Sequence, residues 1–199
     1  MKHAFQQSAF CIKRRNPEFQ RAFSLYDALV ALTVVSTVAT VAVPSFQQLT
    51  FSQRMTGAVN SMVTALHLAR SEAIKRRARA ILCPSVDGRV CHIGGSGSTV
   101  WEEGYLLYID HNGNHAFDAD DMAVWVFAAT AGLFIRSSPS RNHVTYQPNG
   151  LASGSNLSIT FCDKHDRGAP RAVIVSSGGR PRVSTRNSGG GVIRCNAAS

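Results

Sequence analysis

Two arginines near the end of the chain have a spacing that suits binding of an anion. The run Gly179-Arg180-Pro181-Arg182 lies between two strand-like segments, so its arginines are expected to project from a hairpin or loop. Residues 164–199 carry seven basic residues and one acid, Asp166. Guanidinium groups match phosphate in geometry, and clustered cations gain affinity for nucleic acid by releasing counterions. The stretch is therefore a candidate phosphate-binding surface, and a solvated basic hairpin without a ligand is the alternative.

Cysteines offer a second kind of chemistry. The sequence has five: Cys11, Cys83, Cys91, Cys162 and Cys195. The last four all follow a long apolar stretch, and outside the cytoplasm an even number of cysteines favours disulfides. Three pairings are open; we prefer Cys83–Cys91 with Cys162–Cys195, for which loop closure gives roughly 2.5 and 4 kcal/mol. A zinc site that combines these cysteines with His92 is the alternative, although paired CxxC units are missing.

The segment 110–121 partly imitates a calcium-binding loop. Loop positions one, three, five, nine and twelve are occupied by Asp110, Asn112, Asn114, Asp118 and Asp121. The sixth position is His115, where the loop needs Gly, and the twelfth is Asp in place of Glu. No pair of helices is expected around it. We therefore expect a polar turn between strands, and no metal.

Catalytic motifs do not occur in the sequence. It contains no HExxH, no GxxxxGK[ST] and no GxSxG. Asp163, His165 and Asp166 lie next to Cys162, but three neighbours in one loop do not define a catalytic geometry. We expect no enzymatic activity and no cofactor.

Apart from Cys11, all these groups follow a long apolar segment that begins near residue 28. Between Asp27 and Arg54 there is no ionisable side chain, and the 22 residues from Ala28 to Leu49 would form a helix of about 33 Å, enough to cross a bilayer. A carboxylate deep in lipid costs about 2.5–3.5 kcal/mol, so Asp27 needs a partner or an interfacial position. A secretory signal peptide, a plain transmembrane anchor and a buried core helix are the alternatives.

After the apolar segment the pattern changes to an amphipathic helix and then to strands. One apolar face recurs at spacings of three and four: Phe51, Met55, Val59, Met62, Leu66, Ala69 and Ala73. We expect a single helix from Leu25 to Arg79. Short β-rich runs follow at 80–83, 89–93, 104–109, 123–128, 133–136, 144–146, 157–162, 172–176, 182–185 and 192–195. The predicted fold class is α+β, with a long helix packed on an antiparallel sheet.

Several stretches together resemble a known family. Ala22-Phe23-Ser24-Leu25-Tyr26-Asp27 resembles the type IV prepilin signal, with Ala22 in place of the usual Gly and Asp27 in place of the usual Glu. The run LARSEAIKR at residues 68–76 resembles the signature helix of GspH/FimT-type pilin-like proteins. A Trp-Glu-x-Gly-Tyr stretch at 101–105 and the run at 179–182 extend the resemblance over residues 22 to about 195.

The resemblance implies an organisation and a function. Residues 1–22 would be a leader removed by prepilin peptidase between Ala22 and Phe23, 23–50 a helix in the bacterial inner membrane, and 51–199 a periplasmic head. The new N-terminus would be methylated. Asp27 would pair with the terminal amine of a neighbouring subunit. The implied function is that of a minor pilin of a type IV pilus or a pseudopilin of the type II secretion system, assembled in a fibre with other pilins.

A second function is also implied by the resemblance. In some FimT-type pilins a GRxR motif in this region binds DNA during natural transformation, and Gly179, Arg180 and Arg182 match that motif. Double-stranded DNA is therefore an alternative partner. The structural role and the DNA-binding role both remain open on the sequence.

Overall fold

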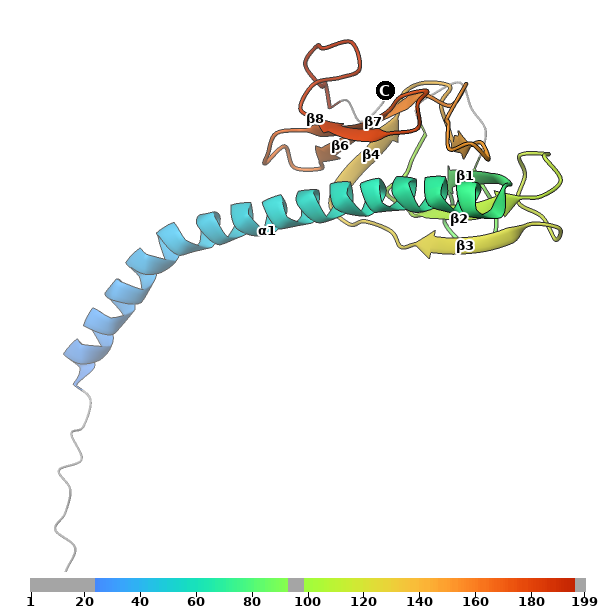
Figure 1. Ribbon diagram of the computed structural model, residues 1–199. Coiled ribbons are helices and arrows are strands. Elements are labelled where there is room, and N and C mark those ends of the chain that lie inside the picture. Colours follow the sequence, from blue (N-terminus) through green and yellow to red (C-terminus); the bar gives the residue numbers. More distant parts are fainter. Residues whose placement is uncertain (1–23, 93–98, 196–199) are drawn as a thin grey trace, which may run out of the picture. The chain divides into compact units, whose positions relative to one another are not determined.

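One continuous helix links two units of the chain. The computed structural model describes residues 24–92 and 99–195. It divides into two compact units, Met1–Pro44 and Ser45–Ser199. Helix α1 (Leu25–Arg76) begins in the first unit and continues into the second (Figure 1). By length and composition, α1 contains a segment able to cross a membrane.

Helix α1 begins with a capping box. The backbone N–H of Tyr26 donates to Ser24 Oγ at 3.3 Å, and the N–H of Ser24 donates to Asp27 Oδ2 at 3.3 Å. This reciprocal pair satisfies backbone donors that the first turn of a helix leaves without intrahelical partners. At the other end Arg77 has a φ of 54°, the left-handed conformation that commonly ends helices. The helix therefore ends at Arg76, three residues before the predicted end, and the first strand starts at Arg79.

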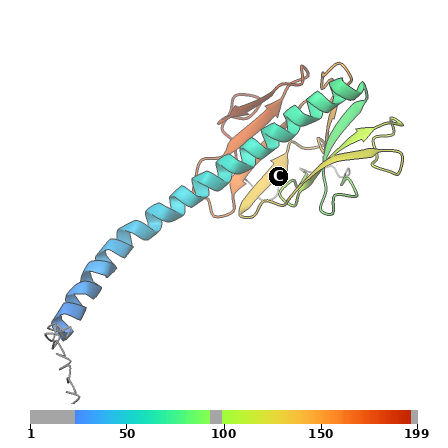
Figure 2. The same cartoon turned by 60° about the horizontal axis from the view of Figure 1, so that its bottom comes forward.

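The second unit contains two antiparallel four-stranded sheets (Figures 1 and 2). The first sheet has the order β3-β2-β1-β5. Its strands are β1 (Arg79–Pro84), β2 (Tyr105–Asp110), β3 (Met122–Phe127) and β5 (Val144–Tyr146). The second sheet has the order β4-β6-β7-β8. Its strands are β4 (Leu133–Ser137), β6 (Leu157–Asp163), β7 (Arg171–Val175) and β8 (Pro181–Ser184). The α+β class is as predicted, with two sheets in place of one.

The main core lies between α1 and both sheets. The predicted apolar face of the helix, from Phe51 to Ala73, is confirmed, because all seven of its side chains are buried. They join one cluster with Leu82 and Leu107 of the first sheet and with Ile159 and Val173 of the second. A smaller cluster that includes Ile81 and Tyr108 covers the other face of the first sheet. The helix thus positions both sheets by apolar burial.

Two predicted strands are wrong, and both lie in segments held by other means. Residues 89–92 form no strand, because Asp87 Oδ1 accepts the N–H groups of Arg89 at 2.8 Å and Val90 at 3.0 Å and turns the chain. Residues 192–195 have only one bridge, between Val192 and Arg186. The hydrogen-bonded turn at Asp87 therefore fixes the first segment, and a disulfide between Cys195 and Cys162 fixes the second.

Two disulfides close loops on the two sheets. Cys83 of β1 pairs with Cys91, eight residues on, and Cys162 of β6 pairs with Cys195, 33 residues on. These are the local pairs that we preferred from the sequence. The four sulfur atoms are used in these bonds, so they do not form the alternative zinc site. Within residues 24–92 and 99–195 there is no group of three or more metal-ligating side chains.

Candidate functional site

The basic run at 179–182 lies in a β-hairpin whose turn is fixed against the rest of the domain. Strands β7 and β8 are paired, and the N–H of Gly179 donates to the carbonyl of Ser176 at 2.8 Å. The N–H of Ala152 donates to the carbonyl of Ser177 at 3.0 Å and attaches the turn to a neighbouring loop. Gly179 has a φ of 73°, and a Cβ there would overlap the carbonyl oxygen of Gly150. Glycine is therefore required by the docking of the turn.

Both arginines of the run are exposed. Arg180 directly precedes β8, and Arg182 lies within it, opposite Ile174 of β7. Ile174 packs outside the main core, whereas Val173 is buried in it, so Arg182 is on the outer face of the second sheet. Among the described residues neither arginine has an ion-pair partner. The pair is thus available to an external anion.

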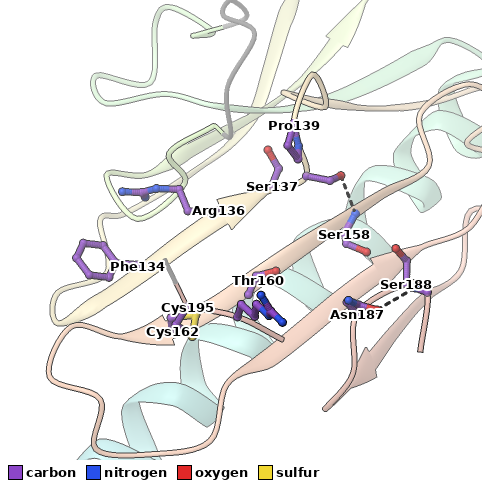
Figure 3. A pocket seen from close by; sticks show the side chains of 13 residues that line it. Phe134, Arg136, Ser137, Pro139, Ser158, Thr160, Cys162, Asn187, Ser188 and Cys195 are labelled. Atoms are coloured by element: carbon purple, nitrogen blue, oxygen red, sulfur yellow. Dashed lines mark hydrogen bonds between the residues drawn. A yellow bond between two sulfur atoms is a disulfide. The ribbon is translucent and has the colours of Figure 1, made fainter. Parts of the chain in front are cut away.

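The same outer face carries a depression of about 300 Å³ (Figure 3). Phe134 and Arg136 of β4, Thr160 of β6 and Arg194 line it, and the Cys162–Cys195 disulfide closes one side. Arg136 is opposite Thr160, and Thr160 is opposite Ala172, which shares the outer face with Ile174. The depression and Arg182 therefore face the same side of the sheet. The sequence does not indicate that Arg136 belongs to this surface, because it lies in another strand far from the basic run.

A buried carboxylate neutralises Arg136. Glu102 forms an ion pair with Arg136, and its Oε2 also accepts the N–H of Ile135 at 3.1 Å. Only 9% of the Glu102 side chain is exposed. Within residues 24–92 and 99–195 Arg194 has no acidic partner, so of the two arginines in the depression it supplies the uncompensated positive charge.

The Trp-Glu-x-Gly-Tyr stretch has a structural function. Trp101 is fully buried, and the hydroxyls of Tyr105 and Ser61 are 2.9 Å apart and hydrogen-bonded, joining the stretch to α1. Gly104 has a φ of 124°, and a Cβ there would come within 2.8 Å of the carbonyl oxygen of Ser85. The stretch fixes the start of β2 against the helix.

The signature helix run is structural as well. Its residues Ala69 and Ala73 are buried in the main core. On the other side Glu72 accepts hydrogen bonds from Arg76 at 2.7 Å and Lys75 at 3.2 Å. The bond from Arg76 is the main reason that the pKa of Glu72 is lowered. The small residues allow the sheets to approach α1, and the ion pairs support its last turns.

The acidic segment 110–121 is a loop whose carboxylates accept hydrogen bonds from the loop itself. Asp110 Oδ1 accepts the N–H of Gly113 at 2.7 Å, and Asp121 accepts those of His111 at 3.0 Å and Asp118 at 3.2 Å. The side chains of Asn112 and Asn114 donate to Asp118 and lower its pKa. The loop has the arrangement of a hydrogen-bonded turn between β2 and β3.

The cluster near Cys162 contains an ion pair. The side chain of Asp163 is fully buried and accepts Arg167 Nε at 2.8 Å and Nη2 at 3.0 Å. These side-chain bonds are the largest cause of the lowered pKa of Asp163, about 2. The geometry gives Asp163 a structural function in its loop, and His165 and Asp166 do not join it in a catalytic arrangement.

Of the residues predicted to act in processing and assembly, the structure describes Asp27 but not Ala22 and Phe23. Asp27 lies in the first turn of α1 and is exposed, where it accepts the N–H of Ser24. This capping function could be recognised in the sequence as Ser-x-x-Asp, and it was missed there. Ala22 and Phe23, the predicted cut, lie outside the described residues.

The chain has a long helix whose first half is apolar and unburied and whose second half packs against a β-sheet head. This arrangement is that of pilin-like proteins. Over residues 58–179 the chain matches the family described as "Type II transport protein GspH". This match covers more than half of the chain, and the protein belongs to that family. The family consists of pilin-like structural subunits, not of enzymes.

Two solved structures are similar to the chain. One crystal structure of the type IV minor pilin FimU from Pseudomonas aeruginosa aligns with a TM-score of 0.51 and 19% identity, covering 68% of this chain and 92% of that one. A second crystal form of FimU gives a TM-score of 0.49 and 18% identity, covering 65% and 91%. A comparison with curated proteins found no match. The first likeness shows the pilin fold.

Proposed function

We propose that the protein is a minor pilin or pseudopilin that is inserted in the bacterial inner membrane and then assembled into a fibre. The observation that carries this proposal is the exposure of the apolar part of α1. Every described side chain from 24 to 43 is exposed, including Leu32 at 65% and Val35 at 63%. A helix this apolar is stable only when lipid or other subunits cover it.

Polar side chains within this part of the helix support the same proposal. The hydroxyls of four residues each donate to the carbonyl three positions earlier: Thr33, Ser36, Thr37 and Thr40. Their hydrogen-bonding needs are met inside the helix, so they do not oppose burial in lipid or against a neighbouring helix. Asp27 is the one ionisable side chain between Tyr26 and Arg54. In the proposed fibre it receives the N-terminal amine of a neighbouring subunit.

Mapping of the N-terminus tests this proposal. Mass spectrometry of protein extracted from membranes of cells that contain a prepilin peptidase is expected to find a chain that starts at Phe23, with a methylated amine. In cells that lack the peptidase the chain should start at Met1. A mature chain that starts after Ala42, or an unprocessed chain in both cell types, would contradict the proposal.

DNA binding is a second candidate function, which the exposed arginine pair favours. Arg180 and Arg182 extend from a hairpin whose turn is attached to a neighbouring loop, and among the described residues they have no acidic partner. Arg182 faces the same side as Arg194. Because the backbone of the hairpin is already fixed, its unpaired guanidinium groups can bind phosphate without a further loss of backbone freedom.

A mobility-shift assay with duplex DNA tests this second function. The assay uses the full chain in neutral detergent. The test variant carries Arg180→Gln and Arg182→Gln. The matched control carries Arg77→Gln and Arg89→Gln, which replace two exposed arginines outside the hairpin. Both variants have the same net charge. The test variant is expected to bind DNA more weakly, and the slope of log K against log salt concentration is expected to fall in magnitude by about two, one for each lost phosphate contact. The control variant is expected to keep the wild-type affinity and slope. Equal losses in both would indicate bulk charge alone.

A further inference from the structure

A pocket of about 280 Å³ lies where the head packs on the part of α1 around the end of the apolar run. Gln48, Phe51 and Ser52 of α1 form one wall, and the segment from Arg167 to Arg171 forms the other. All of these residues belong to the second unit. The pocket is separate from the basic hairpin turn and from the depression that contains Arg194, since they share no lining residue.

The wall opposite the helix is in close contact with it. A Cβ on Gly168 would overlap Cε1 of Phe51, so the backbone of this loop lies directly against the edge of the ring. The guanidinium of Arg167 is 5.5 Å from the centre of the same ring and is paired with the buried Asp163. Phe51 itself is buried. These contacts preform the pocket before any ligand enters.

The pocket has a net positive charge. Arg167 is balanced by Asp163, whereas the side chain of Arg171 has no acidic partner among the described residues and donates through Nη1 to a neutral hydroxyl, Thr56 Oγ1, at 3.4 Å. The lining contains no acidic side chain, and its other polar residues include Gln48 and Ser52. Arg171 therefore presents an uncompensated guanidinium beside neutral hydrogen-bonding groups, an environment that suits a phosphate.

Position along the helix identifies the source of that phosphate. The apolar run ends at Leu49, between two residues of the pocket wall. Residues 48–52 rise by only about 6 Å along a helix, so they lie at the depth where hydrocarbon gives way to headgroups if residues 28–49 span the bilayer. A ligand in this pocket contacts apolar side chains of α1, among them the ring of Phe51, on one side and Arg171 on the other.

We propose that this pocket binds the phosphate headgroup of an anionic phospholipid. Arg171 pairs with the phosphate, and Gln48 and Ser52 donate to the headgroup oxygens. This contact fixes the depth and orientation of the head at the membrane before the subunit enters a fibre. The inference rests on membrane anchoring of residues 28–49 and is independent of fibre assembly and of DNA binding.

Native mass spectrometry of the full chain, released from detergent micelles, tests the site. The probes are phosphatidylglycerol and phosphatidylcholine at equal concentration, and inorganic phosphate is the competitor. The wild type is expected to retain phosphatidylglycerol preferentially. Arg171→Gln should lower its apparent affinity about fivefold, the contribution of one basic residue near an anionic surface. Arg171→Lys should retain most of it, and the distant Arg89→Gln should leave it unchanged.

A second variant guards against loss of folding in the first. Ser52 is exposed on the helix, so Ser52→Glu should fold normally while adding a carboxylate to the pocket wall. It is expected to abolish the preference for phosphatidylglycerol. Equal retention of the two lipids by the wild type, or an unchanged preference in Ser52→Glu, would overturn the proposal. Displacement of the lipid by an equal concentration of inorganic phosphate would also overturn it, by assigning the pocket to a soluble anion.

Discussion

Replacing Gly179 with Ala should destabilise the head while leaving both arginines of the hairpin in the chain. Two costs apply. An L-residue at a φ of 73° costs about 1–2 kcal/mol relative to glycine. A Cβ at this position would also overlap the carbonyl oxygen of Gly150 and come within 3.0 Å of Tyr146 Cε1. Separating the two loops costs about 1–3 kcal/mol more. The expected loss in the free energy of unfolding is about 2–5 kcal/mol.

Urea unfolding of the full chain in detergent, followed by tryptophan fluorescence, measures this loss. With an m-value of about 2 kcal/mol/M, the midpoint should fall by about 1–2.5 M. Gly178→Ala is the matched control. Its φ is not left-handed, and the atom nearest to its added Cβ, Ser176 Oγ, is 3.8 Å away. An unchanged midpoint for Gly179→Ala, or an equal fall for Gly178→Ala, would refute the argument that docking of the turn requires glycine.

Two further predictions concern the loop after β6. The lowered pKa of Asp163, about 2, means that its carboxylate stabilises the fold above about pH 4 and that this stability is lost as the pH falls toward 2. The Arg167 side chain is 39% exposed, so solvent weakens the ion pair, and Asp163→Asn should lower the free energy of unfolding by only about 1–2 kcal/mol at neutral pH. In this variant the urea midpoint should fall less between pH 4 and pH 2 than it does in the wild type. An unchanged dependence on pH would contradict this. Removing the second disulfide with Cys162→Ala and Cys195→Ala should cost about 2–4 kcal/mol and lower the melting temperature. Because the remaining Cys83–Cys91 bond closes a shorter loop, a reductant should lower the melting temperature of this variant by less than that of the wild type; a variant that melts at the wild-type temperature would contradict the prediction.

The helix and most strands could be predicted from the sequence because their signals are local. A repeat of three and four identified the buried face of α1 from Phe51 to Ala73, and short β-rich runs bounded by Gly and Pro identified eight strands. The division into two sheets could not be predicted. It depends on which strands pair, such as β1 with β5 and β4 with β6, and these pairings are set by tertiary packing.

The candidate site was predicted only in part for a similar reason. Arg180 and Arg182 are separated by a single residue and could be recognised as one motif. Arg136 reaches the same face from β4, and its neutralisation by Glu102 depends on a contact between residues 34 positions apart. No local pattern encodes that contact. The pocket between Gln48 and Arg171 was missed as well, because its two walls come from opposite ends of the head sequence.

The residues that define the family and the residues that could distinguish its functions lie in different parts of the molecule. Ala69 and Trp101 are buried in the core between α1 and the sheets, and Glu72 forms ion pairs within the last turns of that helix. These contacts support the fold and do not depend on what the fibre does. Arg180 and Arg182 are exposed and can change without disturbing the core. A pilus subunit, a secretion pseudopilin and a DNA-binding pilin can therefore share one core, and the difference between them must be sought on the exposed hairpin and on the unburied part of the helix.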